Sequence, residues 1–301
     1  MEPAPGRAGM NTPAETRSRR IDAHQHFWHY EAAHFPWIDD TKSLLKRDYL
    51  PSDLEPQLRA AGFDACVVVQ ARHDVNETRF LLQLADEHRF VAGVVAWLDL
   101  QADDLPDQLE RWTKHPELVG IRHIVHDEPD DRFMLRPAFL RGLGRLAAFG
   151  LTYDLLLFPR HLPVTIDVVS RFPDQRFVLD HLAKPPIKAR DIDAWARDLA
   201  RLAAHPNVYA KLSGLVTEAD WQAWTPADLR PCLEVALECF GAQRLMIGSD
   251  WPVCRLAGEY GRVMASIVEF AEEQPAADRD AMLGGTAARC WRLDERNGVR
   301  A

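Results

Sequence analysis

Short runs of apolar, mostly β-branched residues alternate along the chain with longer amphipathic segments. Within the amphipathic segments apolar residues recur at helical spacing, most clearly over residues 80–88 and 229–240. Proline stands shortly before three of the apolar runs, at Pro116, Pro173 and Pro206, where it ends the preceding helix. The runs themselves predict eight strands, at residues 21–27, 65–70, 91–98, 118–125, 151–158, 176–181, 208–212 and 245–249.

Strands that are each separated by one helix predict βα units and a parallel sheet. The first and last runs begin 224 residues apart (245 − 21), an average of 32 residues per step. Eight such units match a (β/α)8 TIM-type barrel, whose typical size is about 250 residues. An open, doubly wound α/β sheet is the alternative, but the regular repeat favours a closed barrel.

The domain organisation follows from the same pattern. No linker-like stretch interrupts residues 21–293, so we predict one barrel domain over residues 21–301. Residues 1–20 have no apolar periodicity and are rich in Pro, Gly, Ala and Arg, which predicts a disordered tail. The sequence leaves open whether translation starts at Met1 or at Met10.

Composition excludes several classes of function. The net charge of −9 (36 − 45) argues against nucleic-acid binding. No apolar run approaches the roughly 20 residues that cross a bilayer, and no signal-peptide core is present, so no membrane partner is expected. Five cysteines without a C-x-x-C pair are typical of reduced thiols in a cytoplasmic protein. We expect a small-molecule partner, and a homo-oligomer remains open.

Two histidines lie at the end of the first predicted strand. Alternate residues of a strand face the same side, so His24 and His26 are expected to point together, with Asp22 beneath them. Paired imidazoles form either a metal site or a pair of donors to an oxyanion. The alternative is that one of them is a hydrogen-bonded core residue.

Two more polar groups follow later strands. The sixth run ends in Asp-His, which places His181 at the rim, and the eighth continues through Gly and Ser to Asp250. Each has a structural alternative, since Asp250 suits a turn or helix cap. The carboxyl ends of all strands meet at one face of a barrel, so His24, His26, His181 and Asp250 are expected to converge. The residue types predict a hydrolytic site.

Three motifs in this order resemble the amidohydrolase superfamily: D-A-H-Q-H-F-W at 22–28, D-H-L-A-K-P at 180–185 and G-S-D-W-P at 248–252. They are most similar to the branch that contains sugar lactonases, such as L-fuconolactonase and L-rhamnonolactonase, and the pyrone-dicarboxylate lactonases. The resemblance extends over residues 21–293 and implies the barrel fold, a lactone substrate and carbohydrate catabolism.

The resemblance also implies roles for the converging residues. His24, His26 and His181 would surround the lactone carbonyl, and Asp250 would be the base that activates water. The run 151–158 holds no histidine and the fourth run no metal-bridging lysine, so the ligand set of two-metal members is incomplete. Either one divalent ion, zinc or manganese, binds His24, His26 and Asp250, or no metal is required and the histidines polarise the carbonyl.

Substrate contacts are expected from side chains at or near the strand ends. Trp28 offers an aromatic face for a sugar ring. Arg122 and Lys211 have an alternative role as buried, paired charges. Hydrogen bonds to the lactone are predicted from Gln70, Arg122, Tyr153 and Lys211.

The arginines near the predicted rim give a clue to substrate charge. Arg72, Arg122 and Arg255 do not form an obvious cluster, which favours a neutral polyhydroxy lactone over a dicarboxylate.

We therefore predict a hydrolase that opens the ring ester of an aldonolactone, such as L-fuconolactone, by means of Asp-activated water. Two alternatives remain at this stage. One is a metal-dependent decarboxylase or amide hydrolase on the same barrel. The other is a non-catalytic barrel that binds sugar acids.

Overall fold

Eight parallel strands form a single sheet in the order β1 to β8, and a computed structural model describes them within residues 18–297. Backbone hydrogen bonds also join the first strand to the end of the last, from Asp250 N to His24 O (2.8 Å) and from His26 N to Trp251 O (2.7 Å). The predicted (β/α)8 barrel is confirmed. Its strands are β1 Ile21–Gln25, β2 Ala65–Val69, β3 Val91–Ala96, β4 Leu118–His123, β5 Thr152–Leu155, β6 Phe177–Leu179, β7 Val208–Leu212 and β8 Leu245–Ile247.

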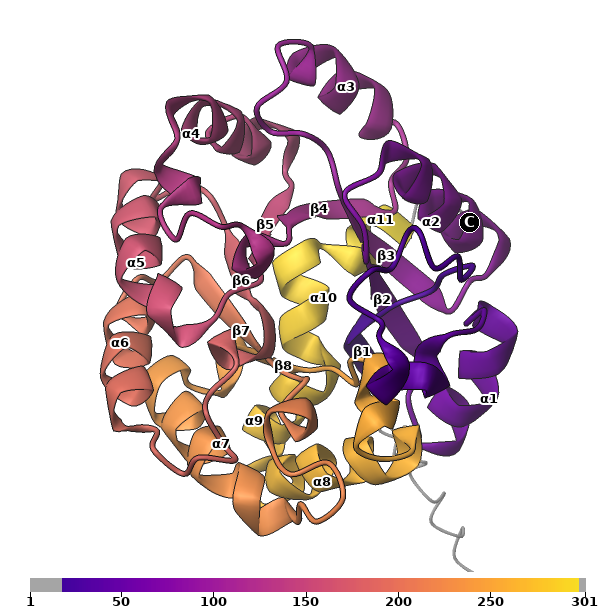
Figure 1. Ribbon diagram of the computed structural model, residues 1–301, viewed down its shortest axis with the longest axis vertical. Coiled ribbons are helices and arrows are strands. Elements are labelled where there is room, and N and C mark those ends of the chain that lie inside the picture. The colour runs from indigo at the N-terminus through magenta and orange to yellow at the C-terminus, as the bar shows by residue number, and fades with distance from the viewer. Residues whose placement is uncertain (1–17, 298–301) are drawn as a thin grey trace, which may run out of the picture.

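A helix follows each strand, and the helices form an outer ring around the sheet (Figure 1). Five of them begin with proline in the first turn, where a missing N–H costs nothing and the fixed φ suits the helix. The helices are α1 Pro51–Ala60, α2 Val75–Glu87, α3 Leu105–Trp112, α4 Pro137–Leu143, α5 Leu162–Arg171, α6 Asp193–Ala203, α7 Pro226–Phe240, α8 Tyr260–Glu272, α9 Ala276–Asp280, α10 Thr286–Trp291 and α11 Leu293–Asn297.

The predicted strand runs are correct in position but too long at their carboxyl ends. β7 has its predicted bounds, whereas the other seven strands stop one to three residues earlier than predicted. His26, His181 and Asp250 thus stand just beyond their strands, yet all three are buried. An apolar pattern follows the burial of side chains rather than the bounds of a strand, so burial that continues past the strand ends makes the predicted runs too long.

The barrel has two hydrophobic cores. The larger lies between strands and helices, and the smaller fills the barrel interior. Residues of α10 belong to the inner core, where Trp291 donates its indole N–H to Thr152 Oγ1 (3.1 Å). Figure 1 shows α10 in yellow within the outline of the strands. Helix α10 therefore fills the barrel from the amino ends of the strands, which the sequence pattern did not predict.

At the N-terminal boundary, β1 begins at Ile21, directly after the predicted tail. Of the predicted tail, residues 1–17 lie outside the described part of the chain, so that prediction is untested there. Arg20, its last residue, is joined to the barrel by its backbone N–H, which donates to Asp64 Oδ2 (2.8 Å), and by an ion pair with Glu272 (2.9 Å). No helix within residues 18–297 has the length and apolarity needed to span a membrane.

Candidate active site

A cavity of about 280 Å³ opens at the carboxyl ends of the strands. His26, His181 and Asp250 contribute to its lining, as do the aromatic side chains of Trp28 and Trp221. Functional sites of (β/α)8 enzymes lie at this face, because the loops that follow the strands meet there.

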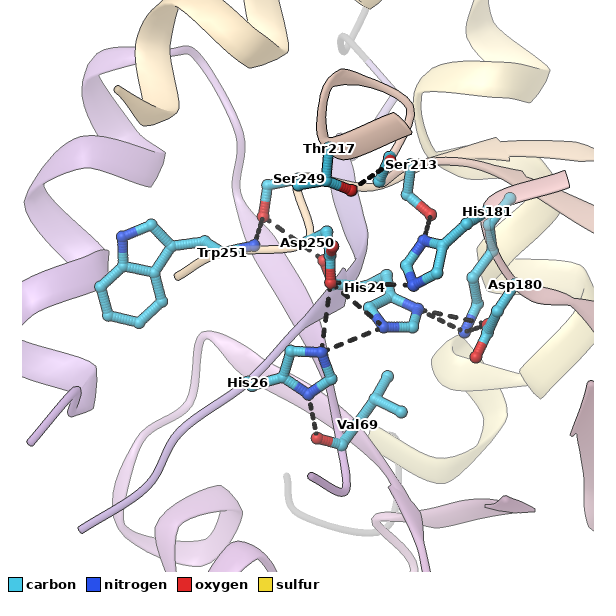
Figure 2. Close-up of polar contacts among 12 residues, drawn as sticks. His24, His26, Val69, Asp180, His181, Ser213, Thr217, Ser249, Asp250 and Trp251 are labelled. Carbon is cyan, nitrogen blue, oxygen red and sulfur yellow. Dashed lines mark hydrogen bonds and ion pairs between the residues drawn. The ribbon is translucent and has the colours of Figure 1, made fainter. Parts of the chain in front are cut away.

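His24 of β1 and His26, just beyond the strand, point toward each other. Their Nε2 atoms are 3.3 Å apart, as predicted from alternation (Figure 2). The Nδ1 atom of His26 lies 2.7 Å from the carbonyl oxygen of Val69. A carbonyl only accepts hydrogen bonds, so Nδ1 carries a proton and donates to Val69, while Nε2 faces Asp250 at 3.3 Å.

The expectation that Asp22 lies beneath the pair was wrong. Its carboxylate accepts the backbone N–H groups of Ser249 (2.8 Å) and His24 (3.2 Å), and the hydroxyl of Tyr260 in α8 donates to its other oxygen (3.3 Å). The register of β1 against β2 shifts between Asp22 and Gln25, so strict alternation fails across this short strand. Asp22 faces the helices and ties β1 to β8.

The sixth strand delivers His181 through an unusual turn. Residues 181–184 all have positive φ, between 51° and 59°, although none is glycine. Such a left-handed run is sterically unfavourable for L-residues and occurs chiefly where the surrounding structure enforces it. His181 Nδ1 lies 2.8 Å from Ser213 Oγ, while its Nε2 is directed at Asp250.

Asp250 is the point of convergence. Its Oδ1 lies 3.3 Å from Nε2 of His26, 3.7 Å from Nε2 of His181 and 3.8 Å from Nε2 of His24 (Figure 2). The four residues predicted to converge are therefore brought together, although Asp250 follows His24 by 226 residues (250 − 24). Asp250 itself has φ of 57°, a second left-handed position at the site.

Burial controls the protonation of this cluster. It lowers the pKa of His24 well below its ordinary value and that of His181 to about 4, so both rings are neutral near pH 7. Burial alone would raise the pKa of Asp250, but His181 and His26 outweigh it and hold that pKa below its usual range. His24 and His181 are therefore neutral beside an ionised carboxylate.

A buried ion network lies beneath His24 and contains Arg122 and Lys211 as paired charges, the alternative role given to them above. Lys211 Nζ is 2.6 Å from Asp154 Oδ2 and 2.9 Å from Asp180 Oδ1. Arg122 donates to Asp180 Oδ2 (2.8 Å), and Asp180 Oδ1 lies 3.2 Å from His24 Nδ1. A second Arg122 contact, 3.3 Å to His24 Nε2, requires that Nε2 accept. The network holds His24 as the tautomer with its proton on Nδ1.

The cations of this network do not neutralise the negative charge of Asp250. Arg122 and Lys211 are two cations that offset the carboxylates of Asp154 and Asp180. Among residues 18–297, Asp250 has only histidines, and no lysine or arginine, as ion-pair partners. A buried carboxylate surrounded by imidazole nitrogens is an environment that a cation would stabilise.

The donor set itself fits a divalent metal ion. The ligand atoms of His24, His26 and Asp250 lie within 4.8 Å of one another. Tetrahedral zinc with bonds of about 2.0–2.1 Å to nitrogen separates its ligands by about 3.3 Å, which is close to the 3.3–3.8 Å found here. Ligating histidines usually donate their second N–H to a carbonyl or carboxylate, as His26 does to Val69.

Some of the residues predicted to contact the substrate line the cavity, and others do not. Trp28 and Arg122 line the cavity. Lys211 is fully buried in the ion network, and the Gln70 side chain donates to the carbonyl of Arg122 (3.3 Å). Neither of these two lines the cavity. For Lys211, the alternative role as a buried, paired charge describes its position.

The substrate-contact prediction for Tyr153 was wrong. Its ring packs between Phe139 and Phe177 in the outer core, at centroid distances of 5.8 and 6.4 Å. The neighbouring Thr152 and Asp154 of β5 point into the barrel, so Tyr153 points outward. Side chains alternate along a strand, so an inward direction for Thr152 and Asp154 predicts from the sequence that Tyr153 points outward.

The comparisons with known proteins agree with this geometry. A family model described as amidohydrolase matches residues 21–293. The chain belongs to the amidohydrolase family. This amidohydrolase is 46% identical to an L-fucono-1,5-lactonase of Burkholderia multivorans over 92% of its own length and 97% of that protein. It is 40% identical to an L-fucono-1,5-lactonase of Burkholderia ambifaria, over 93% and 97% respectively.

A solved structure shows the same barrel in a related protein. An amidohydrolase from Burkholderia multivorans, crystallised with bound zinc, superposes with a TM-score of 0.88 at 45% identity. The match covers 92% of this chain and 100% of that one. The fold and the family predicted from the three motifs are thus confirmed.

Proposed function

We propose that this amidohydrolase opens the ring ester of L-fucono-1,5-lactone, or of a closely related aldonolactone, to give the hydroxy acid. The observation that carries the proposal is the convergence of three histidine Nε2 atoms on the Asp250 carboxylate. It occurs in a chain 46% identical to an L-fucono-1,5-lactonase. We propose that a single domain over residues 21–301 performs the reaction.

Asp250 acts as the base in the proposed reaction. Its pKa lies below the usual range, so it is ionised near pH 7 and accepts a proton from water as the hydroxyl adds to the lactone carbonyl. The carbonyl oxygen then carries negative charge, and we assign its stabilisation to the guanidinium of Arg122, which lines the cavity. As the ester C–O bond breaks, Asp250 returns the proton to the departing ring oxygen.

The cofactor we propose is one divalent ion, zinc, held by His24, His26 and Asp250, with His181 beside them. When bound, it supplies Lewis-acid polarisation of the carbonyl and lowers the pKa of water. The Nδ1–H of His26 is engaged by the Val69 carbonyl, which holds Nε2 toward His24 and Asp250 as the ligation of one shared ion requires.

The decisive experiment is an Asp250→Asn variant assayed for proton release from L-fucono-1,5-lactone, with the spontaneous rate subtracted. We expect kcat to fall about 10²–10⁴-fold, the range typical for loss of a general base. Asp174→Asn, at an exposed position, is the matched control and should keep full activity. A folded Asp250→Asn protein as active as the wild type would contradict the proposal.

The same assay distinguishes the alternative functions. A decarboxylase would release CO₂ from an aromatic acid and leave the lactone intact, and an amide hydrolase would cleave a cyclic amide instead. A non-catalytic barrel would bind the sugar acid without proton release. The ionised Asp250 at the floor of the cavity favours hydrolysis over mere binding.

We propose a cytoplasmic location for the enzyme and a small lactone as its partner. The five cysteines are free thiols, four of them buried, which supports a reducing compartment.

A further inference from the structure

One wall of the cavity carries an ion pair that the proposed reaction does not use. Lys184, in the loop after β6, and Glu218, in the loop after β7, are joined by a 2.9 Å contact between Nζ and Oε1. Both line the cavity, and their side chains are 17% and 22% exposed, so the pair is accessible to a ligand. Glu218 Oε2 has no hydrogen-bond partner among the described residues.

Both partners are held in fixed positions relative to His181. Lys184 ends the left-handed run that starts at His181, and its backbone N–H donates to the His181 carbonyl (2.8 Å). On the other side, Gly214 packs against the His181 ring, and the hydroxyl of Thr217, next to Glu218, donates to the Gly214 carbonyl (2.8 Å). A ligand bound by Lys184 and Glu218 therefore has a fixed position relative to His181.

The charge of the cavity indicates which ligands it suits. The lysines and arginine that line it within the described residues are all paired with carboxylates of the protein: Lys42 with Asp39, Arg122 with Asp180, and Lys184 with Glu218. None of them is left free to form a bidentate contact with a substrate carboxylate. The cavity thus suits a neutral ring rather than a dicarboxylate.

A cation and a carboxylate side by side match the chemistry of adjacent hydroxyl groups. Each hydroxyl both donates and accepts a hydrogen bond, so a vicinal pair can accept from an ammonium and donate to a carboxylate. Beside them, Trp221 also lines the cavity, and its indole N–H is engaged by the Thr217 carbonyl (2.9 Å). Its ring offers apolar area to the C–H face of a sugar ring.

We propose that Lys184 and Glu218 bind two adjacent hydroxyls of a neutral lactone ring and so determine specificity for polyhydroxylated lactones. Lys184 donates to one hydroxyl, and Glu218 Oε2 accepts from its neighbour. The inference rests on the proposed lactonase function and adds the substrate feature that the cavity recognises.

The test compares two lactones with the same six-membered ring. L-fucono-1,5-lactone carries ring hydroxyls, whereas δ-valerolactone carries none. We expect Lys184→Met and Glu218→Gln each to lower kcat/KM for the hydroxylated lactone about 10–100-fold, chiefly through KM, because each removes a charged hydrogen bond. For δ-valerolactone, kcat/KM should change less than about threefold, since no bond to a hydroxyl is lost.

The chain provides a matched control pair. Lys188 and Asp220 form an ion pair of 3.2 Å between the same two loops, but their side chains are 69% and 48% exposed and do not line the cavity. Lys188→Met and Asp220→Asn should leave both lactones unaffected. Equal losses on both lactones in the Lys184 and Glu218 variants would indicate a structural role and overturn the proposal, as would no loss on either.

A binding measurement separates this inference from the proposed function. L-fucose has the ring hydroxyls but no ester, and its affinity is measured by calorimetry for the wild type and both variants. If the wild type hydrolyses no lactone but binds L-fucose at least about tenfold more tightly than the variants, the lactonase proposal fails and the hydroxyl-binding pair stands. Equal binding by all three proteins overturns the pair.

Discussion

At the scale of single residues, a glycine determines the position of His181, which lies beside the proposed base Asp250. Gly214 has φ of +62°, and a Cβ there would lie 2.5 Å from Nδ1 of His181. That distance is shorter than any real contact, and Nδ1 is the atom that meets Ser213. The His181 ring could not keep its place beside a larger residue at position 214.

We therefore expect Gly214→Ala to lower kcat on L-fucono-1,5-lactone at least about tenfold, because a catalytic group displaced by 1 Å typically costs up to 100-fold. Gly241→Ala is the control, since Gly241 has a similar φ of +66° and a Cβ there would meet no atom within 4 Å. Gly241→Ala should lose about 1 kcal/mol of stability from backbone strain, and Gly214→Ala should lose more, because its methyl group also overlaps the His181 ring. Equal kcat values for the two variants would show that the ring tolerates the methyl group.

At the scale of elements, the barrel interior depends on the C-terminal helix. Trp291 of α10 is buried in the inner core, and the ammonium of Lys211 lies 5.3 Å from the centre of its ring. The helix thus supports the ion network beneath His24 from the amino end of the barrel. Helix α10, which lies outside the three sequence motifs, thus helps to hold the site in place.

Trp291→Ala is expected to lower the free energy of unfolding by about 3–5 kcal/mol, the usual cost of removing a buried aromatic side chain. Urea denaturation measures the change. Trp37→Ala, which removes a side chain that is 36% exposed, should cost less than about 1 kcal/mol. A loss for Trp291→Ala as small as that for Trp37→Ala would contradict the role assigned to α10.

The start of α5 contributes a pH dependence. His161 Nδ1 accepts the backbone N–H of Phe158 (3.0 Å), and burial lowers the pKa of this histidine. Below about pH 6.5 the unfolded chain therefore binds a proton that the folded chain does not, so folding stability falls as the pH falls. The contribution is at most about 1.4 kcal/mol per pH unit.

His161→Asn keeps an acceptor near Phe158 but does not titrate. We expect its unfolding free energy to fall less steeply than that of the wild type between pH 6.5 and pH 5 in urea titrations. His34→Asn, which replaces an exposed histidine, should follow the wild type. Parallel profiles for all three proteins would refute the assignment to His161.

At the scale of the whole molecule, the site joins three segments that are far apart in sequence. The proposed ligands and their neighbour come from the ends of β1, β6 and β8, and β1 and β8 meet where the sheet closes. An ion bound there would cross-link β1 to β8, where the sheet closes. Because such an ion binds the folded chain only, it shifts the unfolding equilibrium by mass action.

Zinc at 100 times its dissociation constant should stabilise the chelator-treated protein by about 2.7 kcal/mol and raise Tm by several degrees. Differential scanning calorimetry measures this shift. His26→Gln removes one proposed ligand and should abolish most of it, whereas His34→Gln should retain it. An undiminished shift in His26→Gln would place the zinc elsewhere.

The fold and the four converging residues could be predicted from sequence because their signals are local. Each strand run and each motif is contiguous, and parallel strands necessarily bring their carboxyl ends to one face of a barrel. His24, His26, His181 and Asp250 needed no further information than their positions at strand ends. The same holds for the order and number of the strands.

The remaining features were decided only by tertiary structure, because they depend on how separate segments register against one another. A shift in β1 turned Asp22 toward α8, and alternation in β5 turned Tyr153 away from the cavity. Lys211 lies 57 residues from its partner Asp154, and Lys184 lies 34 from Glu218. Nothing local in the sequence pairs such charges; only the packed barrel brings them within hydrogen-bonding distance.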